Sequence, residues 1–245
     1  MDSFSRDELD YVTKSLQQGI RLDCRDLDES REMSISEGSS SQPDKSMVLK
    51  RGLSEIELRI SFKLSAHSVV TIQLPNEILF MDRLFGNLKP GIIPNQSSWN
   101  RGINPDDYRT IETKHLPPNP SIAILEKFLI KFKIGVTIEV GIRKNDGNVF
   151  DMIFDGIRHA FASIKVPDVN DLKKEIDAGV DLPKSTSYAV FETSVISDPT
   201  LIEETAALGV IHVFKDKFDK VINFVSEKSI NKDRYKSLVE AFANN

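Results

Sequence analysis

The 245-residue sequence contains a single cysteine, Cys24, so no disulfide can form within the chain. Such sparing use of cysteine is typical of proteins that work in a reducing compartment. No apolar run approaches the roughly 20 residues that a membrane-spanning helix needs, and the acidic start MDSFSRDELD is unlike a signal peptide. We therefore expect a soluble intracellular protein.

Several chemical motifs are missing as well. Neither GxGxxG nor GxxxxGKS/T occurs, which removes the common glycine-rich nucleotide sites. One cysteine cannot form the cysteine clusters of structural zinc sites. The net charge of −5 argues against broad, self-sufficient binding of nucleic acid or anionic membranes, while leaving room for a local basic patch. With 40% hydrophobic residues, the chain is long enough for one large domain or two similar halves.

The stretch from Phe128 to Ile164 is the most regular part of the sequence. Every even position from Ile130 to Ile142 is apolar, a period of two that places these side chains on one face of a strand. A turn signal follows at 145–147, and apolar residues from Val149 to Ile164 then recur at helical spacing. The sequence therefore predicts a long half-buried strand that leads directly into an amphipathic helix, as in an α/β or α+β domain.

Further elements are expected on both sides of this unit. Ser5 and Glu8 form a capping box for an N-terminal helix that Gly19 ends. In the first half we expect strands at 32–36, 56–64 and 69–74, the last two as neighbours around a turn at 67–68, and a loop over 37–46. In the second half we expect a helix from Asn104 that ends before Pro117, strands at 121–125 and 189–195, a short helix at 169–176, a hairpin of 208–214 with 220–225, and a C-terminal helix from Asn231.

One polar cluster stands out on the expected central helix. Asp151, Asp155 and His159 are spaced i, i+4, i+8, which places two carboxylates and an imidazole on one helical face. Such a set could bind a divalent metal or act in acid–base chemistry, although a metal site needs further ligands. The interpretation that we favour is a solvated face opposite the apolar stripe of the helix.

Other polar residues are weaker candidates. Cys24 beside Arg25 could be an activated thiol, since a nearby cation lowers a thiol pKa, but no His or Asn partner is identifiable. His212 is expected to be a strand-surface or hydrogen-bonded core residue rather than a catalyst. Four cations could line a path for a polyanion, although alternating charges on a strand usually serve solubility: Lys127, Lys131, Lys133 and Arg143.

Three motifs follow one another along the chain. The first is GIRLDCR at 19–25 with SREMSI at 30–35, the second is VGIRKNDGNVFD at 140–151 with VPDV at 166–169, and the third is SDPTLIEE at 197–204. They resemble the R-x-D-G-R opening, the strand–DGN–LLD–helix segment and the D-P-T-x-x-E-E turn of the ribonuclease PH (RNase PH) family, in its exosome-ring branch. The resemblance spans nearly the whole chain and includes the helix at 5–18.

The departures from the family pattern bear on activity. Cys24 stands where the family has glycine, and residues 76–118 do not follow its helix-containing middle. Active members bind phosphate through a G-S/T-R-type element and carry a catalytic aspartate soon after the E-E turn. Here no such element occurs, and residues 205–212 contain no carboxylate. Because phosphorolysis needs bound phosphate and a stabilised leaving oxygen, the resemblance implies a catalytically silent ring subunit in which Asp151 and Glu139 are structural.

The resemblance also implies the architecture. We expect the α+β class and a two-layer RNase PH-like fold (ribosomal protein S5 domain 2-like) built as duplicated β-α halves. An N-terminal helix would occupy 1–20 and the RNase PH-like domain 21–245, with loop-rich segments at 36–46 and 86–118. Neither a metal nor a cofactor is expected.

The same resemblance implies binding partners and a cellular location. It implies a heteromeric ring of RNase PH-like subunits with S1/KH-type cap subunits around an RNA channel, no membrane attachment, and a role in RNA (including rRNA) processing in nucleus, nucleolus and cytoplasm. RNA contacts are expected at four cations of the irregular middle segment: Lys89, Arg101, Arg109 and Lys114. Two alternatives stay open: an active phosphorolytic 3′–5′ exoribonuclease, and a small-molecule enzyme of similar fold that uses Asp151, Asp155 and His159.

Overall fold

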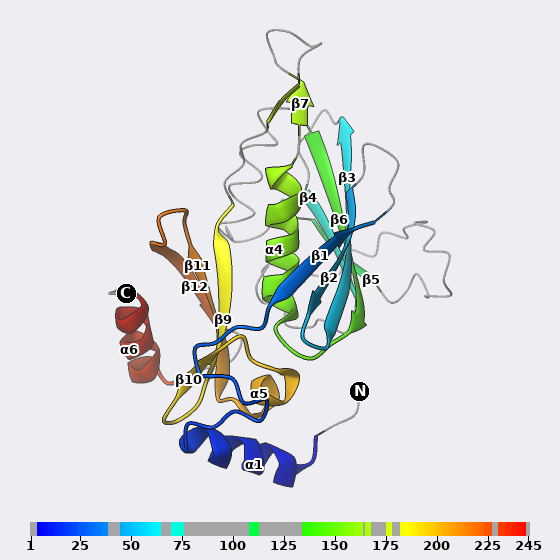
Figure 1. Ribbon diagram of the computed structural model, residues 1–245. Helices are drawn as coiled ribbons and strands as arrows, with labels where there is room; N and C mark the ends of the chain where they lie inside the picture. The colour runs from blue at the N-terminus through cyan, green and yellow to red at the C-terminus, as the bar shows by residue number, and fades with distance from the viewer. Residues whose placement is uncertain are drawn as a thin grey trace.

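The computed structural model shows two β-sheets with a long helix between them (Figure 1). It describes residues 4–38, 45–64, 70–75, 108–112, 134–163, 165–167, 175–177, 182–226 and 230–243. Helices and antiparallel strands are mixed along the chain, which confirms the α+β class. No helix in these ranges is long and apolar enough to cross a membrane.

The larger sheet has six strands in the order β1-β2-β3-β6-β4-β5, and every neighbouring pair is antiparallel except β4 with β6. Its strands are β1 (Met33–Glu37), β2 (Lys45–Arg51), β3 (Ser54–Leu64), β4 (Val70–Pro75), β5 (Tyr108–Glu112) and β6 (Ile134–Lys144). β1, β3 and β6 confirm the predicted strands at 32–36, 56–64 and 130–142, except that residues 130–133 lie outside the described ranges.

Three expectations for this sheet were wrong. β2 begins at Lys45, inside the segment expected to be a loop. β4 does not pair with β3, because β6 lies between them and runs parallel to β4. Residues 108–112 form the edge strand β5 instead of the helix expected from Asn104, since pairing with β4 outweighs the local helix-start signal. The expected strand at 121–125 lies outside the described residues.

Helix α4 (Val149–Ala162) follows β6 and confirms the predicted strand–helix unit. It packs against the larger sheet in one continuous core with Leu49, Leu58 and Val140, and Phe214 of the smaller sheet joins the same core. Gly156 allows the close approach, because a Cβ at this position would lie 2.8 Å from Leu58 Cδ2. α4 is therefore covered by a sheet on each side and is buried over most of its circumference.

The smaller sheet has the order β10-β9-β11-β12 and lies between α4 and the C-terminal helix α6 (Lys232–Ala243) (Figure 1). Its strands are β9 (Lys184–Val190), β10 (Val195–Ser197), β11 (Gly209–Lys215) and β12 (Val221–Ser226). The predicted hairpin and C-terminal helix are confirmed. The strand expected at 189–195 was wrong, because residues 191–194 form the turn between β9 and β10.

A small hairpin of β7 (Lys165–Pro167) and β8 (Glu175–Asp177) follows α4. The short helix expected at 169–176 is thus wrong for residues 175 and 176, and its other positions lie outside the described ranges.

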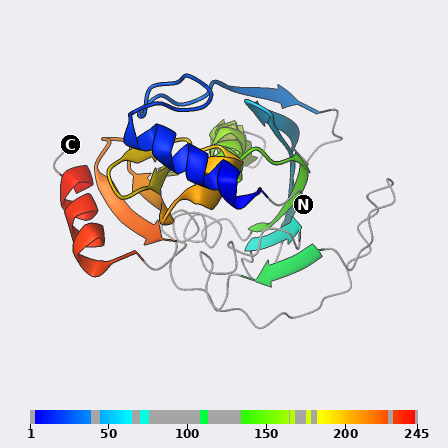
Figure 2. The same cartoon turned by 90° about the horizontal axis from the view of Figure 1, so that it is seen from below.

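Two further helices close one end of the molecule. α1 (Arg6–Gln17) begins with the predicted capping box of Ser5 and Glu8, and α5 (Leu201–Ala206) begins with a capping box of Thr200 and Glu203. Figure 2 shows α1 crossing this end over α5. Val12 and Leu16 of α1 are buried there with apolar residues of the smaller sheet.

Candidate functional site: an ion-pair cluster that joins three motifs

The fold brings the three sequence motifs together at one point. Arg21 of the first motif donates from Nε and Nη2 to the two carboxylate oxygens of Glu203, in the third motif, at 3.0 and 2.7 Å. Both side chains are buried. Arg21 also donates to the backbone carbonyls of Ser197 and Asp198, at 3.0 and 3.1 Å. These additional hydrogen bonds matter, because a buried ion pair is stable only when its remaining donors and acceptors are satisfied.

Asp198 is the centre of the cluster and is only 1% exposed. Its carboxylate accepts hydrogen bonds from the backbone N–H, Nε and Nη2 of Arg31, at 2.7, 2.9 and 3.0 Å. Arg25 Nη1 and Asn148 Nδ2 also donate to it, at 3.0 and 2.5 Å. Burial alone would raise the pKa of Asp198, but the hydrogen bonds and charge of Arg31, with help from Asn148, lower it to about 2. Asp198 therefore stays ionised at neutral pH and links all three motifs.

The turn of the second motif, 145–148, is held against the third. Arg31 Nη1 donates to the carboxylate of Asp146 at 3.1 Å, and the backbone N–H of Asn148 donates to Glu204 Oε1 at 2.6 Å. Gly147 has a φ of +84° and lies so close to α5 that a Cβ would collide with the backbone of Thr200 and Leu201. Glycine is thus required here for both its conformation and its size.

The two carboxylates of the expected solvated helix face are buried in a second cluster. Asp151 accepts hydrogen bonds from Ser185 Oγ at 2.7 Å and from Ser187 Oγ and N at 2.8 and 2.6 Å. Asp155 pairs with Arg51 at 3.1 Å and with Arg158 at 3.4 Å. Burial raises the pKa of Asp155, and the charge of Asp151 adds to this effect against the opposing charge of Arg51.

The expected solvated face was therefore wrong, because the smaller sheet covers Asp151, whereas Asp155 pairs with Arg51 of the larger sheet and is only 9% exposed. His159, the third member of that set, is exposed to solvent, whereas the two carboxylates are buried. Within the described ranges, no group of three or more His, Cys, Asp or Glu side chains could hold a metal ion. Asp151, Asp155 and His159 do not form a metal site.

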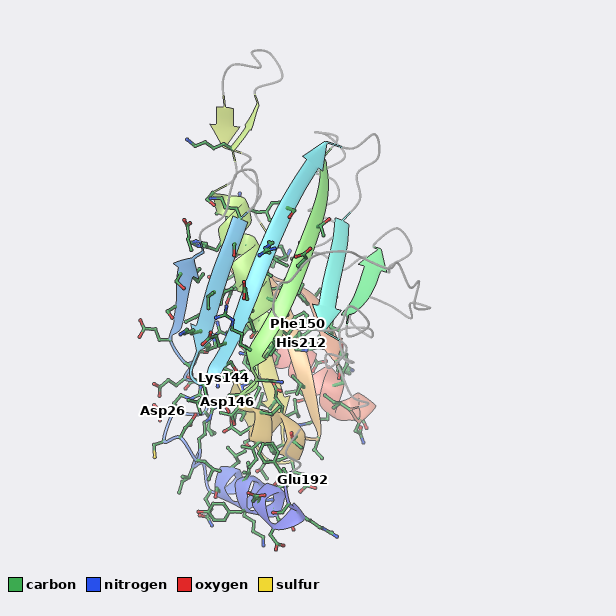
Figure 3. The ribbon with its side chains drawn as sticks, turned by 90° about the vertical axis from the view of Figure 1, so that its right-hand side faces the viewer. Asp26, Lys144, Asp146, Phe150, Glu192 and His212 are labelled. Carbon is green, nitrogen blue, oxygen red and sulfur yellow. The ribbon has the colours of Figure 1, made fainter. Side chains whose placement is uncertain are left out.

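His212 confirms the expectation of a hydrogen-bonded core residue. Its Nδ1 lies 2.7 Å from Ser187 Oγ, and its ring packs on Phe150 with the centroids 4.1 Å apart. Figure 3 shows the two rings where α4 meets the smaller sheet. The imidazole is 2% exposed and is linked through Ser187 to Asp151, so it stabilises the contact of α4 with this sheet.

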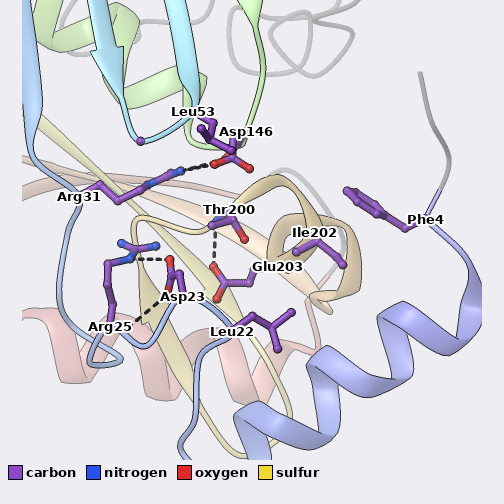
Figure 4. A pocket seen from close by; sticks show the side chains of 11 residues that line it. Phe4, Leu22, Asp23, Arg25, Arg31, Leu53, Asp146, Thr200, Ile202 and Glu203 are labelled. Carbon is purple, nitrogen blue, oxygen red and sulfur yellow. Dashed lines mark hydrogen bonds and ion pairs between the residues drawn. The ribbon is translucent and has the colours of Figure 1, made fainter.

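A pocket of about 700 Å³ opens beside the ion-pair cluster (Figure 4). Its wall combines apolar side chains with the edge of the cluster. The lining residues are Phe4, Leu22, Asp23, Arg25, Arg31, Gly52, Leu53, Asp146, Thr200, Ile202 and Glu203.

Cys24 is exposed beside this pocket, with a free thiol and a φ of +63°. This is the left-handed region that favours glycine, the residue of the family motif at this position. The neighbouring guanidinium of Arg25 is directed to Asp23 and Asp198, at 2.7 and 3.0 Å. Among the described residues, the neighbouring cation is therefore engaged by carboxylates rather than by the thiol.

The structure tests few of the expected polyanion contacts. Arg109 lies on β5, opposite Leu74 of β4, whereas Lys89, Arg101 and Lys114 lie outside the described residues. Arg143 pairs with Glu55 and Glu57 of β3 at 3.0 and 2.7 Å, an arrangement typical of a solvated sheet surface. Lys127, Lys131 and Lys133 also lie outside the described ranges.

Sequence reasoning missed the partners of the α4 carboxylates. Arg51 lies beside the turn of the β2–β3 hairpin, and no pattern in the sequence connects it with Asp155. Ser185 and Ser187 did carry a signal, because they share one face of β9 with the buried Ala189 at a period of two. Small residues on a face that packs against a helix are consistent with a close approach.

Comparison with known proteins identifies the fold. No protein-family model and no curated protein sequence matches the chain. Among solved structures, a chain of the Archaeoglobus fulgidus exosome with RNA bound to the active site matches with a TM-score of 0.61 and 17% identity, over 97% of this chain and 94% of its own. A chain of an archaeal exosome core matches with a TM-score of 0.62 and 17% identity, over 97% of this chain and 93% of its own. Rice (Oryza sativa) Rrp46 matches with a TM-score of 0.51 and 13% identity, over 91% of this chain and 95% of its own. The chain therefore has the RNase PH-like α+β fold of these exosome proteins, as the sequence motifs predicted.

Proposed function

We propose that this chain is a non-catalytic RNase PH-like subunit of the RNA exosome ring, supporting 3′–5′ RNA processing and degradation. The observation that carries the proposal is the convergence of the three motifs on one buried ion-pair cluster. Arg21, Arg25 and Arg31 bind carboxylates of their own chain at hydrogen-bond distance. In this arrangement the motifs stabilise the fold, and their cations are engaged before any phosphate arrives.

The region after the third motif supports a silent subunit. Residues 205–212 provide no carboxylate, and the polar side chain at the end of this stretch, His212, is buried against Phe150. Phosphorolysis requires a cradle for inorganic phosphate and a group that assists the leaving 3′ oxygen. Because neither is found among the described residues of the cluster, we infer a scaffold rather than a phosphorolytic exoribonuclease.

The extent of the fold likeness supports a place in a ring. The two archaeal chains match over 97% of this chain and over more than nine-tenths of their own length. We propose that the chain packs between other RNase PH-like subunits, beneath S1/KH-type cap subunits, in nucleus, nucleolus and cytoplasm. Within this ring, Lys89, Arg101, Arg109 and Lys114 would contact RNA in the channel.

The first test is purification of the tagged full chain from its native cells, followed by intact-complex mass spectrometry. We expect recovery in one large assembly with several other RNase PH-like chains. Recovery only as a monomer or a homo-oligomer would contradict the ring proposal.

A second test addresses catalysis directly. The purified chain is incubated with uniformly labelled single-stranded RNA, with and without inorganic phosphate, and released nucleoside diphosphates are measured. We expect no phosphate-dependent release, whereas release that requires phosphate would establish the exoribonuclease alternative.

A further inference from the structure

The pocket beside the ion-pair cluster has an apolar mouth. Leu53 is 74% exposed and Leu22 is 46% exposed, on opposite sides of the opening (Figure 4). Phe4, in the segment before α1, and Ile202 of α5 continue the apolar wall. Large apolar side chains that gather at one opening mark an interaction surface more often than do single exposed ones.

The position of Leu53 is set by a rigid turn. Arg51 pairs with Ser54 across the β2–β3 hairpin, so that Gly52 and Leu53 alone form its tip. Gly52 has a φ of +56°, as two-residue hairpin turns require. Ser54 Oγ in turn donates to Gly147 O at 3.0 Å and accepts from Asp146 N at 2.8 Å. The exposed leucine is therefore presented by an ordered scaffold.

The polar part of the rim is acidic. Asp23 and Asp146 have side chains 34% and 31% exposed, whereas the guanidinium-bearing side chains of Arg25 and Arg31 are only 10% and 9% exposed. Four guanidiniums, those of Arg21, Arg25, Arg31 and Arg51, pair with the four carboxylates of Asp23, Asp146, Asp198 and Glu203. The rim is acidic because the more exposed charged side chains at the opening are the carboxylates of Asp23 and Asp146.

Asp146 lies partly buried beside Arg31 at this rim. Burial raises its pKa, and the charges of Asp23 and Glu203 add to the rise, although Arg31 opposes it. The partly exposed carboxylates of Asp23 and Asp146 repel a phosphate group and attract a cation. The rim therefore suits a basic side chain, and it does not suit RNA.

We propose that this pocket binds a segment of a partner protein in which an apolar side chain is followed or preceded closely by Lys or Arg. The apolar side chain packs between Leu53 and Leu22, and the basic group lies against Asp23 and Asp146. This inference rests on the proposed function, because the partner is sought among the chains of the same assembly.

The test places the photo-crosslinker p-benzoylphenylalanine at position 53 of the tagged full chain in native cells. Position 218 is the matched control, since Phe218 is 78% exposed at the tip of another hairpin. We expect a crosslink at position 53, absent at 218, to a peptide of a co-purifying chain that has an apolar residue within three positions of Lys or Arg. A crosslink to RNA, to a second copy of this chain or to a peptide without a basic residue would overturn the proposal, as would no crosslink.

Substitutions complete the test. Leu53→Asp should lower the co-purified amount of the crosslinked chain about tenfold, as for an anchor side chain of an interface, whereas Phe218→Asp should leave it unchanged. An equal effect of both substitutions, or none from Leu53→Asp, would contradict the inference. If the large assembly is recovered but position 53 gives no such crosslink, the pocket inference fails while the ring proposal stands. If no assembly is recovered, the ring proposal itself fails.

Discussion

At the scale of single residues, Asp198 shows why the charges of the cluster stabilise the protein. One buried carboxylate receives N–H donors from Arg25, Arg31 and Asn148, so its ionised form is strongly favoured in the folded chain. In the unfolded chain the same carboxylate has only water for a partner. The difference in pKa between the two states is therefore a contribution to stability.

This difference predicts a pH dependence. The pKa of Asp198 falls from an ordinary value of 3.8 to about 2 in the folded state. Since the folded pKa is depressed, the stabilisation is fully present above the unfolded pKa and is lost as pH falls toward 2. It amounts to about 2 kcal/mol. We compare the unfolding free energies of wild type and Asp198→Asn by urea denaturation. We expect the difference between them to be smaller at pH 2 than at pH 7 by about this amount.

Asp146→Asn provides the control for that measurement. Because burial raises the folded pKa of Asp146, ionisation of this residue disfavours the folded state, and its pH dependence should have the opposite sign. A gap for Asp198→Asn that stays constant between pH 7 and pH 2 would contradict the assigned role of Asp198.

The backbone of Cys24 allows a second residue-level prediction. A non-glycine residue at a φ of +63° is strained, and the exposed thiol packs little that could be lost. We expect Cys24→Gly to raise the free energy of unfolding by about 0.5–1 kcal/mol, measured by urea denaturation. Cys24→Ala, which keeps the strain, should leave it nearly unchanged; a similar gain in both variants would point to the thiol instead.

The sequence identified the motif residues but not their contacts. Arg21, Asp198 and Glu203 were recognisable from the family pattern, although nothing in the sequence joined Arg31 to Asp198 across 167 positions. Asp155 was misplaced for a related reason. Helical periodicity shows which residues share a face, but it cannot show that Arg51 of β2 will pair with Asp155 or that β9 will cover Asp151.

At the scale of elements, the turn between β6 and α4 depends on Gly147. Alanine at this position would combine a left-handed backbone with a collision against the start of α5. We expect Gly147→Ala to destabilise the protein by at least about 2 kcal/mol, measured by urea unfolding. Gly19→Ala is the matched control, because its φ of +76° is similar but its Cβ would meet nothing within 4 Å. Equal losses in the two variants would show that the collision contributes nothing.

Long periodic elements were predictable, and short paired strands were not. β6 and α4 show clear periods of two and 3.6, so their type could be read from the residues alone. β5 and β8 are short strands held by single neighbours, β4 and β7, and local helix signals misled the prediction there. β6 inserts between β3 and β4 although its residues follow their partners in those strands by more than 60 positions in the sequence. Rules for hairpins pair strands that are consecutive in the sequence, so they would have paired β3 with β4.

At the scale of the whole molecule, two β-α halves stack as sheet, helix, sheet, helix. The N-terminal segment lies against the second half although it leads into the first sheet. It is fixed there by α1 on the smaller sheet and by the Arg21–Glu203 pair, whose members are 182 positions apart. The N-terminal segment is thus joined to α5 and the smaller sheet by charge as well as by apolar packing.

This long-range link can be measured by a double-mutant cycle. Arg21→Met leaves the buried carboxylate of Glu203 without its counter-ion, and we expect a loss of about 3–5 kcal/mol in unfolding free energy. The double variant with Glu203→Met removes both charges, so its loss should be smaller than the sum of the two single losses by about 1–3 kcal/mol. Lys236 and Glu240, an exposed pair 3.9 Å apart on α6, give the control cycle, for which the coupling should be near zero. Additive losses at Arg21 and Glu203 would mean that the pair does not hold the N-terminal segment. In that case the apolar contacts of α1 would have to account for its position alone.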